Sequence, residues 1–131
     1  MDRKWMVLFV FVLSFGIFAI LNVYPATMTE YSNKVILDSD IVEFAYVSLN
    51  RTIDNVTVSW LFHNIAGRML NLSITAEFYD KKGDILFSKT NELLKFPVNY
   101  TEYLLLPANR IIYDGPYVSE VDHVVLHVVE G

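Results

Sequence analysis

The pattern of hydrophobic positions changes at about residue 25. From Trp5 to Tyr24 the sequence WMVLFVFVLSFGIFAILNVY contains thirteen Leu, Ile, Phe or Val and no charged residue. Twenty residues in a helix rise about 30 Å, which matches the hydrocarbon core of a bilayer. A helix without a polar face does not suit the surface of a soluble domain. The pattern therefore predicts one transmembrane helix over residues 5–24.

The residues that flank this segment predict its orientation. Arg3 and Lys4 precede it, whereas the seventeen residues after it contain one lysine and three acidic residues. Because positively charged flanks stay in the cytoplasm, residues 1–4 are expected there and the rest of the chain outside the cell membrane. Trp5 and Tyr24 are placed as interfacial aromatics at the two ends, and Pro25 is a suitable helix stop.

Two processed forms of the N-terminus are alternatives to this signal-anchor. A secretory signal has a shorter apolar stretch and a small-x-small cleavage site, and Ser14-Phe15-Gly16 fits such a site only inside the apolar run. A pilin-type leader would need Gly or Ala after Lys4, where the sequence has Trp5. We expect the segment to remain uncleaved.

After the anchor, apolar and polar residues alternate with the period of two that is typical of half-buried strands. Two inward faces are predicted within residues 55–79: Val56, Val58, Trp60 and Phe62 on the first strand, and Leu72, Ile74, Ala76 and Phe78 on the second. The turn Asp80–Asp84, in which Gly83 can take a positive φ, leads into a return strand from Ile85 and so predicts a hairpin.

Three further segments read as strands, at residues 41–49, 98–106 and 121–129. No window shows clear helical amphipathicity, and turn signals separate the strands. Together these features predict a linker over residues 25–40 and, over residues 41–131, an all-β ectodomain. Its expected fold is an antiparallel immunoglobulin-like β-sandwich of six or seven strands.

The stretch from Asn55 to Leu86 resembles the FxLYD-type domains. An alternating strand ends at Asn64, a second strand ends in Phe78-Tyr79-Asp80, and Lys-Lys-Gly-Asp-Ile-Leu follows. These domains are small immunoglobulin-like sandwiches on exported or membrane-anchored prokaryotic proteins, mostly without assigned function. Where the family tends to show Phe-x-Leu-Tyr-Asp, this chain has Ala-Glu-Phe-Tyr-Asp at 76–80. The resemblance implies a prokaryotic surface protein and carries over no catalytic residue.

Charge and cysteine content narrow the possible partners. Residues 25–131 contain eight Lys or Arg and fourteen Asp or Glu. An acidic domain disfavours nucleic acid and anionic lipid head groups, because both require a cationic face. The chain has no cysteine, which excludes disulfides and thiolate metal sites.

Four Asn-x-Ser/Thr sequons follow the anchor, at Asn50, Asn55, Asn71 and Asn99. Random placement of the Asn, Ser and Thr residues would give about one sequon. The excess predicts N-glycosylation on the outer surface. The alternative is that these residues simply populate exposed strands and turns.

Candidate catalytic and metal-binding groups are sparse. His123 and His127 are four residues apart on a strand, about 13 Å, which is too far for one metal ion. Asp80 and Asp84 supply too few carboxylates for calcium. Asp38, with Asp40, lies in the predicted linker, where solvation explains both. No nucleophile elbow or phosphate-binding glycine loop is present, so we expect no enzyme activity, metal or cofactor.

Five tyrosines in the second half of the chain remain: Tyr79, Tyr100, Tyr103, Tyr113 and Tyr117. Tyrosines that point outward favour contact with protein or glycan, and capping of the sandwich edges is the plainer alternative.

The sequence thus predicts a non-enzymatic, single-pass membrane protein whose acidic sandwich serves protein interaction or a structural role. Its expected partners are membrane lipid through residues 5–24 and a protein in or on the membrane. A pilin-like filament subunit with an apolar helix and a β head is the alternative.

Overall fold

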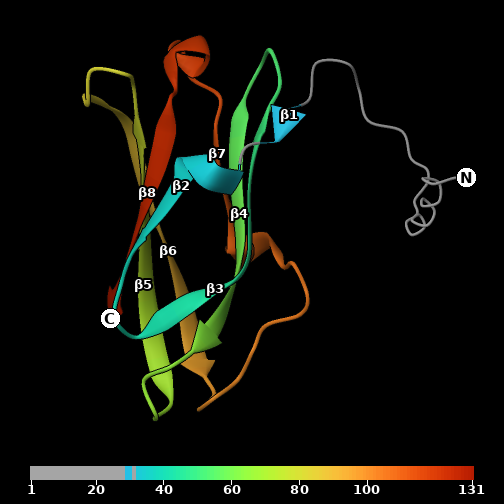
Figure 1. Ribbon diagram of the computed structural model, residues 1–131, viewed down its shortest axis with the longest axis vertical. Helices are drawn as coiled ribbons and strands as arrows, with labels where there is room; N and C mark the ends of the chain where they lie inside the picture. Colours follow the sequence, from blue (N-terminus) through green and yellow to red (C-terminus); the bar gives the residue numbers. More distant parts are fainter. Residues whose placement is uncertain (1–28, 31) are drawn as a thin grey trace, which may run out of the picture.

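The computed structural model describes residues 29–30 and 32–131, which form two packed sheets (Figure 1). The predicted membrane helix at 5–24 lies outside these residues. Within the described ranges, no helix is long and apolar enough to cross a bilayer. The expectation of an all-β sandwich is confirmed.

The first sheet has the strand order β1-β3-β4-β7, and all of its neighbours are antiparallel. Its strands are β1 (Thr29–Glu30), β3 (Val42–Arg51), β4 (Val56–Asn64) and β7 (Arg110–Tyr113). β3 and β4 form a long hairpin with an irregularity between Phe44 and Tyr46.

The second sheet has the order β2-β8-β5-β6. Its strands are β2 (Val35–Asp38), β5 (Leu70–Tyr79), β6 (Ile85–Phe96) and β8 (His123–Glu130). β2 runs parallel to β8, whereas the other pairs are antiparallel. Three short 3-10 helices, η1 (Ser32–Lys34), η2 (Pro107–Asn109) and η3 (Val118–Glu120), lie in the connections.

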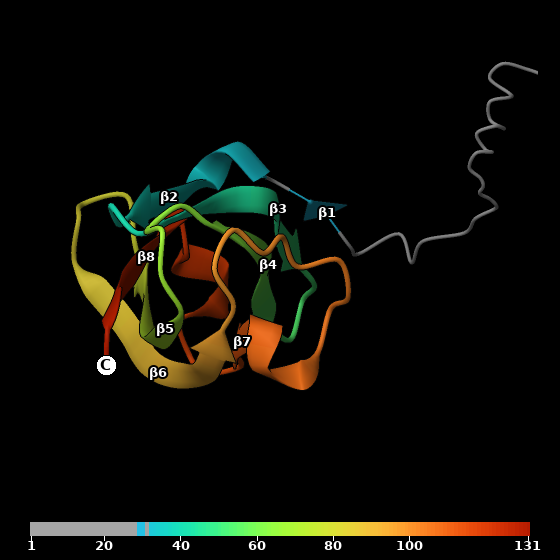
Figure 2. The same cartoon turned by 90° about the horizontal axis from the view of Figure 1, so that it is seen from below.

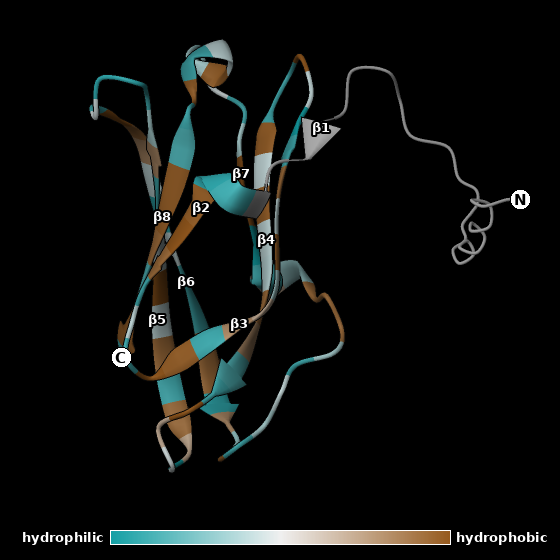
Figure 3. Ribbon diagram, viewed as in Figure 1, coloured by the Kyte–Doolittle hydropathy of each residue, from teal (hydrophilic) through white to brown (hydrophobic). Residues whose placement is uncertain are grey.

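The core lies between the two sheets, where apolar faces meet (Figure 3). The two inward faces predicted on β4 and β5 are confirmed, since each of their eight apolar residues is at most 1% exposed. Trp60 and Phe62 stack with ring centroids 6.0 Å apart, and Phe78 contacts Tyr113 from the opposite sheet. Strand alternation alone places these side chains, because successive residues point to opposite faces.

The predicted β5–β6 hairpin is also present. The Asp80 carboxylate accepts the backbone N–H groups of Lys82, at 2.9 Å, and Asp84, at 3.0 Å. Gly83 has φ +89°, a left-handed conformation that glycine adopts without a Cβ penalty. The turn chemistry is local, which is why the sequence predicts it correctly.

The predicted strand at 98–106 is wrong. This segment is a loop between β6 and β7, and only Thr101 forms an isolated bridge, with His63. The Glu102 carboxylate accepts the Phe62 N–H at 2.8 Å, so a side chain replaces part of the ladder there. On the edge away from β3, β4 pairs with β7, which lies in none of the predicted strand segments.

The first strands begin inside the predicted linker 25–40. β1 and β2 both precede residue 41, so the described residues contain eight strands rather than six or seven. The parallel β2–β8 pair makes the sandwich not wholly antiparallel. Four residues are too few to show a periodic pattern. Asp38 of β2 also lies 89 residues from its neighbour His127, so only tertiary packing reveals this pair.

Candidate functional site

A polar cluster on the outer face of the β2-β8-β5 sheet is centred on His127. Its Nδ1 lies 2.7 Å from the Asp38 carboxylate on β2, and its Nε2 lies 2.7 Å from the Glu77 carboxylate on β5. The Tyr79 hydroxyl donates a hydrogen bond of 2.7 Å to the same Glu77. One imidazole therefore links three neighbouring strands.

The electrostatics of the cluster favour a charged His127. Its hydrogen bonds to Glu77 and then to Asp38 raise the pKa of His127 above 6.5. The hydrogen bond from Tyr79, followed by that from His127, lowers the pKa of Glu77. Neutral imidazole has one donor and one acceptor nitrogen, so two ionised carboxylates are both satisfied only by imidazolium. With both nitrogens occupied, His127 is neither a free base nor a metal ligand.

The cluster continues along the sheet toward the start of β2. The Tyr79 ring stacks on His123 with centroids 5.0 Å apart and planes 3° from parallel. His123 Nδ1 lies 3.0 Å from the Asp122 carboxylate, which pairs with Lys34 at 3.6 Å. The hydrogen bond with His123 is the main cause of the lowered pKa of Asp122. Lys34 immediately precedes β2 and Asp38 ends it, so ionic contacts hold both ends of this strand.

Three of the candidate residues named from the sequence lie in this cluster: Asp38, His123 and His127. Asp38 is part of β2 and contacts His127, rather than lying in a solvated linker with Asp40. His123 and His127 contact different carboxylates, and among the described residues no group of three or more His, Asp or Glu side chains is arranged so that it could hold a metal ion. Sequence reasoning missed the cluster because its members come from three strands. Their outward positions on alternating strands were the available signal.

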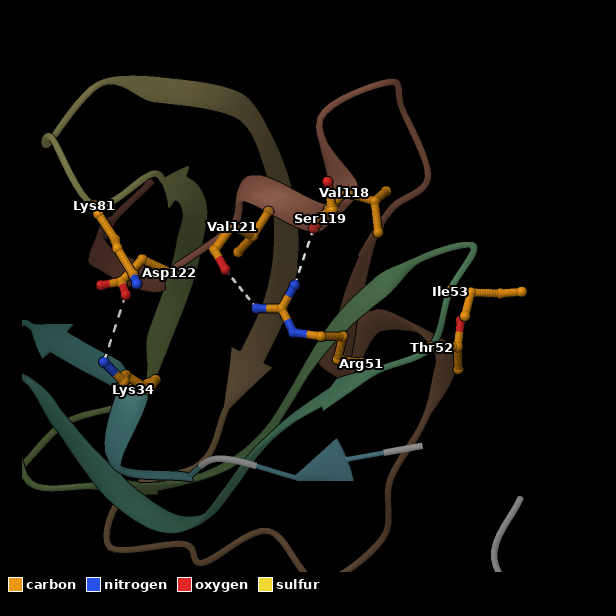
Figure 4. Close-up of a pocket in the computed structure, with 9 residues that line it drawn as sticks. All are labelled: Lys34, Arg51, Thr52, Ile53, Lys81, Val118, Ser119, Val121 and Asp122. Atoms are coloured by element: carbon orange, nitrogen blue, oxygen red, sulfur yellow. Dashed lines mark hydrogen bonds and ion pairs between the residues drawn. The ribbon is translucent and has the colours of Figure 1, made fainter. Parts of the chain in front are cut away.

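An open groove of about 610 Å³ lies at the end of the sandwich that carries the β3–β4 turn (Figure 4). The Arg51 guanidinium extends across it and donates to the carbonyl of Val118 at 2.9 Å and to that of Val121. Lys34 reaches Asp122 on the opposite wall. These contacts hold η3 and the N-terminal strands against the body of the sandwich. The polar side chains that line the groove therefore have a structural role.

The loop between β6 and β7 combines a polar base with an apolar exterior. Glu102 and Asn109 are 8% and 2% exposed, and Asn109 Nδ2 donates to both Glu102 oxygens at 3.1 and 3.2 Å. Asn109 Oδ1 accepts the Leu106 N–H at 3.2 Å. This buried network fixes the shape of the loop. Its large exposed apolar side chains are Val98, Tyr100, Tyr103, Leu104, Leu105 and Leu106, and Asn99 and Thr101 are exposed beside them.

The tyrosines divide between surface and core. Tyr103 and Tyr117 are exposed, and Tyr100 packs edge-to-face against Phe96 and Tyr103. Tyr113 is buried and stacks on Phe87 with ring centroids 5.0 Å apart. Tyr46 on β3 is exposed as well, whereas Tyr100, Tyr103 and Tyr117 lie on loops, the first two on a single loop.

The four sequon asparagines differ in exposure. Asn71 and Asn99 are exposed, whereas Asn50 and Asn55 are half-buried. Asn99 has φ +56°, and the hydroxyl of its sequon partner Thr101 lies 2.6 Å from His63 Nδ1. Glycosylation at these positions stays a prediction.

Comparison with known proteins provides no relative: no family model, no curated protein and no solved structure matches this chain. The resemblance to FxLYD-type domains therefore stays a prediction. The residues and their geometry carry the functional argument.

Proposed function

We propose that this chain is a single-pass membrane protein, anchored by residues 5–24, that holds an acidic immunoglobulin-like β-sandwich outside the cell. It works by contact with a protein in or on the membrane, or as a structural element, and not by catalysis. One observation carries the proposal: in the described residues the clustered polar groups hold the fold together, while exposed aromatic and aliphatic side chains gather on one loop.

Three polar side chains are already engaged in hydrogen bonds within the protein. Both ring nitrogens of His127 contact carboxylates, and Glu102 binds the Phe62 amide and Asn109. The Asn64 side chain is buried and donates to the carbonyls of Arg68 and Pro97, each at 2.9 Å. A general base needs a free lone pair within reach of a substrate proton, which these groups do not offer.

The strand connections support the immunoglobulin-like assignment. The β3–β4 hairpin lies in one sheet and the β5–β6 hairpin in the other, and β7 and β8 then return to pair with β4 and β5 respectively. Chain crossing between two packed sheets is the arrangement of Greek-key sandwiches. A shared sandwich does not specify a partner, so the binding role rests on the exposed surface.

The absence of cysteine from the sequence allows a direct test of topology. We expect Ile53→Cys, at a position 78% exposed, to react with a membrane-impermeant maleimide in intact cells. Asp2→Cys, in the predicted cytoplasmic start, is the matched control and should react only after lysis. Protection of Ile53→Cys until lysis would place the sandwich inside the cell and overturn the proposal.

A further inference from the structure

The segment Tyr103–Leu106 is an irregular loop, with a bend at Leu104, in which four consecutive apolar side chains are exposed. Here Tyr103 is 79% exposed and the three leucines that follow are 59%, 50% and 47% exposed. A protruding segment of this kind needs an apolar medium around it rather than a flat partner against one face.

The loop projects from the same side of the molecule as the N-terminal strand. Both the orange loop before β7 and β1 stand out on the side of the β1-β3-β4-β7 sheet, and two perpendicular views agree (Figures 1 and 2). The outer bend of the loop is among the hydrophobic stretches in Figure 3. A single flat surface on that side can therefore reach both the loop and the start of the described chain.

The local charge differs from that of the whole chain. Between residues 93 and 113 the only charged residues are Lys95, Glu102 and Arg110. Glu102 is buried in its hydrogen bonds, whereas Lys95 and Arg110 are exposed. Lys95 and Arg110 are thus two exposed cations within this stretch, although exposed Glu92 and Asp114 border it and the formal charge of the chain is −5. The two cations can pair with anionic lipid phosphates.

We propose that the β6–β7 loop inserts into the outer leaflet of the membrane that holds the predicted anchor. Leu104, Leu105 and Leu106 enter the acyl boundary, Tyr100 and Tyr103 lie at head-group level, and Lys95 and Arg110 face lipid phosphates. Tyrosine and long cationic side chains favour these depths because each has an apolar body and a polar end. This inference rests on the anchored topology proposed above, and it assigns this loop to lipid, so that any protein contact would use another part of the exposed surface.

The reach of the chain is compatible with two membrane contacts. Five residue steps separate Tyr24, the last residue of the predicted anchor, from Thr29, a span of at most about 18 Å. Thr29 lies opposite Arg51, which pairs with Val56 at the start of β4, and Thr101 bridges to His63 near its end. The contact at the anchor end and the contact at the loop are thus roughly 23 Å apart along β4. The sandwich therefore lies with its strands along the membrane.

Insertion has a consequence for glycosylation. Asn99 lies between two of the exposed apolar residues, Val98 and Tyr100. A hydrated glycan at that position cannot share the acyl boundary with the loop. We therefore expect Asn99 to be unmodified, whereas Asn71, on β5 of the other sheet, remains open to modification.

The test uses the full-length chain with a single introduced cysteine, carrying an environment-sensitive fluorophore, in nanodiscs of phosphatidylcholine and phosphatidylglycerol. Leu105→Cys and Tyr103→Cys report on the loop. Ile85→Cys, 52% exposed at the start of β6 in the other sheet, is the matched exposed control. We expect blue-shifted emission and loss of most of the intensity for the loop labels when the lipid acyl chains are brominated. The Ile85 label should keep its intensity.

Unquenched loop labels, with emission typical of water, would overturn the inference. A glycan found on Asn99 in the native protein would also overturn it, as would a crosslink from Tyr103 to a protein partner in native membranes. The maleimide reaction of Ile53→Cys in intact cells is independent of all three results. Failure of insertion is therefore distinguishable from failure of the proposed topology.

Discussion

His127 on β8 and Glu77 on β5 lie 2.7 Å apart, between Nε2 of the imidazole and a carboxylate oxygen. The opposite ring nitrogen contacts Asp38 at the same distance, so the pair belongs to a bridge that reaches β2. β2 is the first strand of its sheet in chain order, and β1 of the other sheet precedes it. The protonation of one imidazole is thus coupled to the attachment of β2.

The bridge predicts a defined pH dependence of stability. The raised pKa of His127 means that its contribution is fully present below the unfolded value of about 6.5 and is lost as pH rises through the folded value. The lowered pKa of Glu77 means that its contribution is present above about 4.5 and is lost as pH falls through its folded value. Stability from the pair is therefore expected to be largest between about pH 4.5 and 6.5.

Histidine titration by NMR, with urea unfolding in detergent at each pH, measures both effects. His127→Gln should lower the free energy of unfolding most near pH 5.5, by about 1 kcal/mol or less, because the side chain is 37% exposed to screening solvent. Asp38→Asn and Glu77→Gln should each lower the pKa of His127. Other charged groups on this face are Lys34, Asp122, His123 and, on β6, Glu92, whereas the ring hydrogen-bonds to Asp38 and Glu77. An ordinary pKa for His127 in the native chain would contradict the bridge.

Trp60 is predicted to tolerate loss of its indole nitrogen but not loss of its ring. The side chain is fully buried, and Nε1 finds no hydrogen-bond partner among the described residues. Trp60→Phe removes an uncompensated donor together with some volume, so we expect a cost of about 1–2 kcal/mol. Trp60→Ala leaves a large cavity and should cost about 3–5 kcal/mol. If urea unfolding showed the same loss of free energy of unfolding for Trp60→Phe and Trp60→Ala, the indole nitrogen would have a hydrogen-bond partner in the folded protein.

Asn64 is predicted to be a structural hub at the end of β4. Its side chain donates to the carbonyls of Arg68 and Pro97 and accepts the Ala66 N–H at 2.9 Å. Asn64→Ala leaves these buried groups without partners and should lower the free energy of unfolding by about 2–3 kcal/mol. The exposed Asn33→Ala is the control and should have little effect. Similar stability of the two variants would refute the hub.

Glu102 is predicted to hold the β6–β7 loop in shape. Glu102→Ala removes acceptors from the Phe62 N–H and from Asn109, at a cost of about 2 kcal/mol. Amide exchange at Phe62 should become faster, because its N–H loses the carboxylate partner at this edge of β4. The exposed Glu92→Ala on β6 is the matched control and should leave Phe62 exchange unchanged. Unchanged exchange in Glu102→Ala would mean that the loop does not depend on this network.

Local pattern was sufficient for the elements whose partners are close in sequence. Strict alternation placed the core residues of β4 and β5, and Gly83 with Asp80 marked the turn into β6. The same reasoning failed at Tyr103–Leu106, because four consecutive apolar residues between two prolines do not reveal which side is covered. It also failed at Val35–Leu37, which are too short to show a period.

An all-β domain with its principal hairpin and inward faces follows from local sequence, because side-chain alternation and turn preferences act over a few residues. The parallel pairing of β2 with β8, and the contacts of His127 with Asp38 and Glu77, arise only from the packing of the folded domain. That packing also leaves the leucines of the β6–β7 loop facing outward. These features depend on contacts between segments as far as 89 residues apart, whose pairing is set by packing of the whole domain and not by any local pattern.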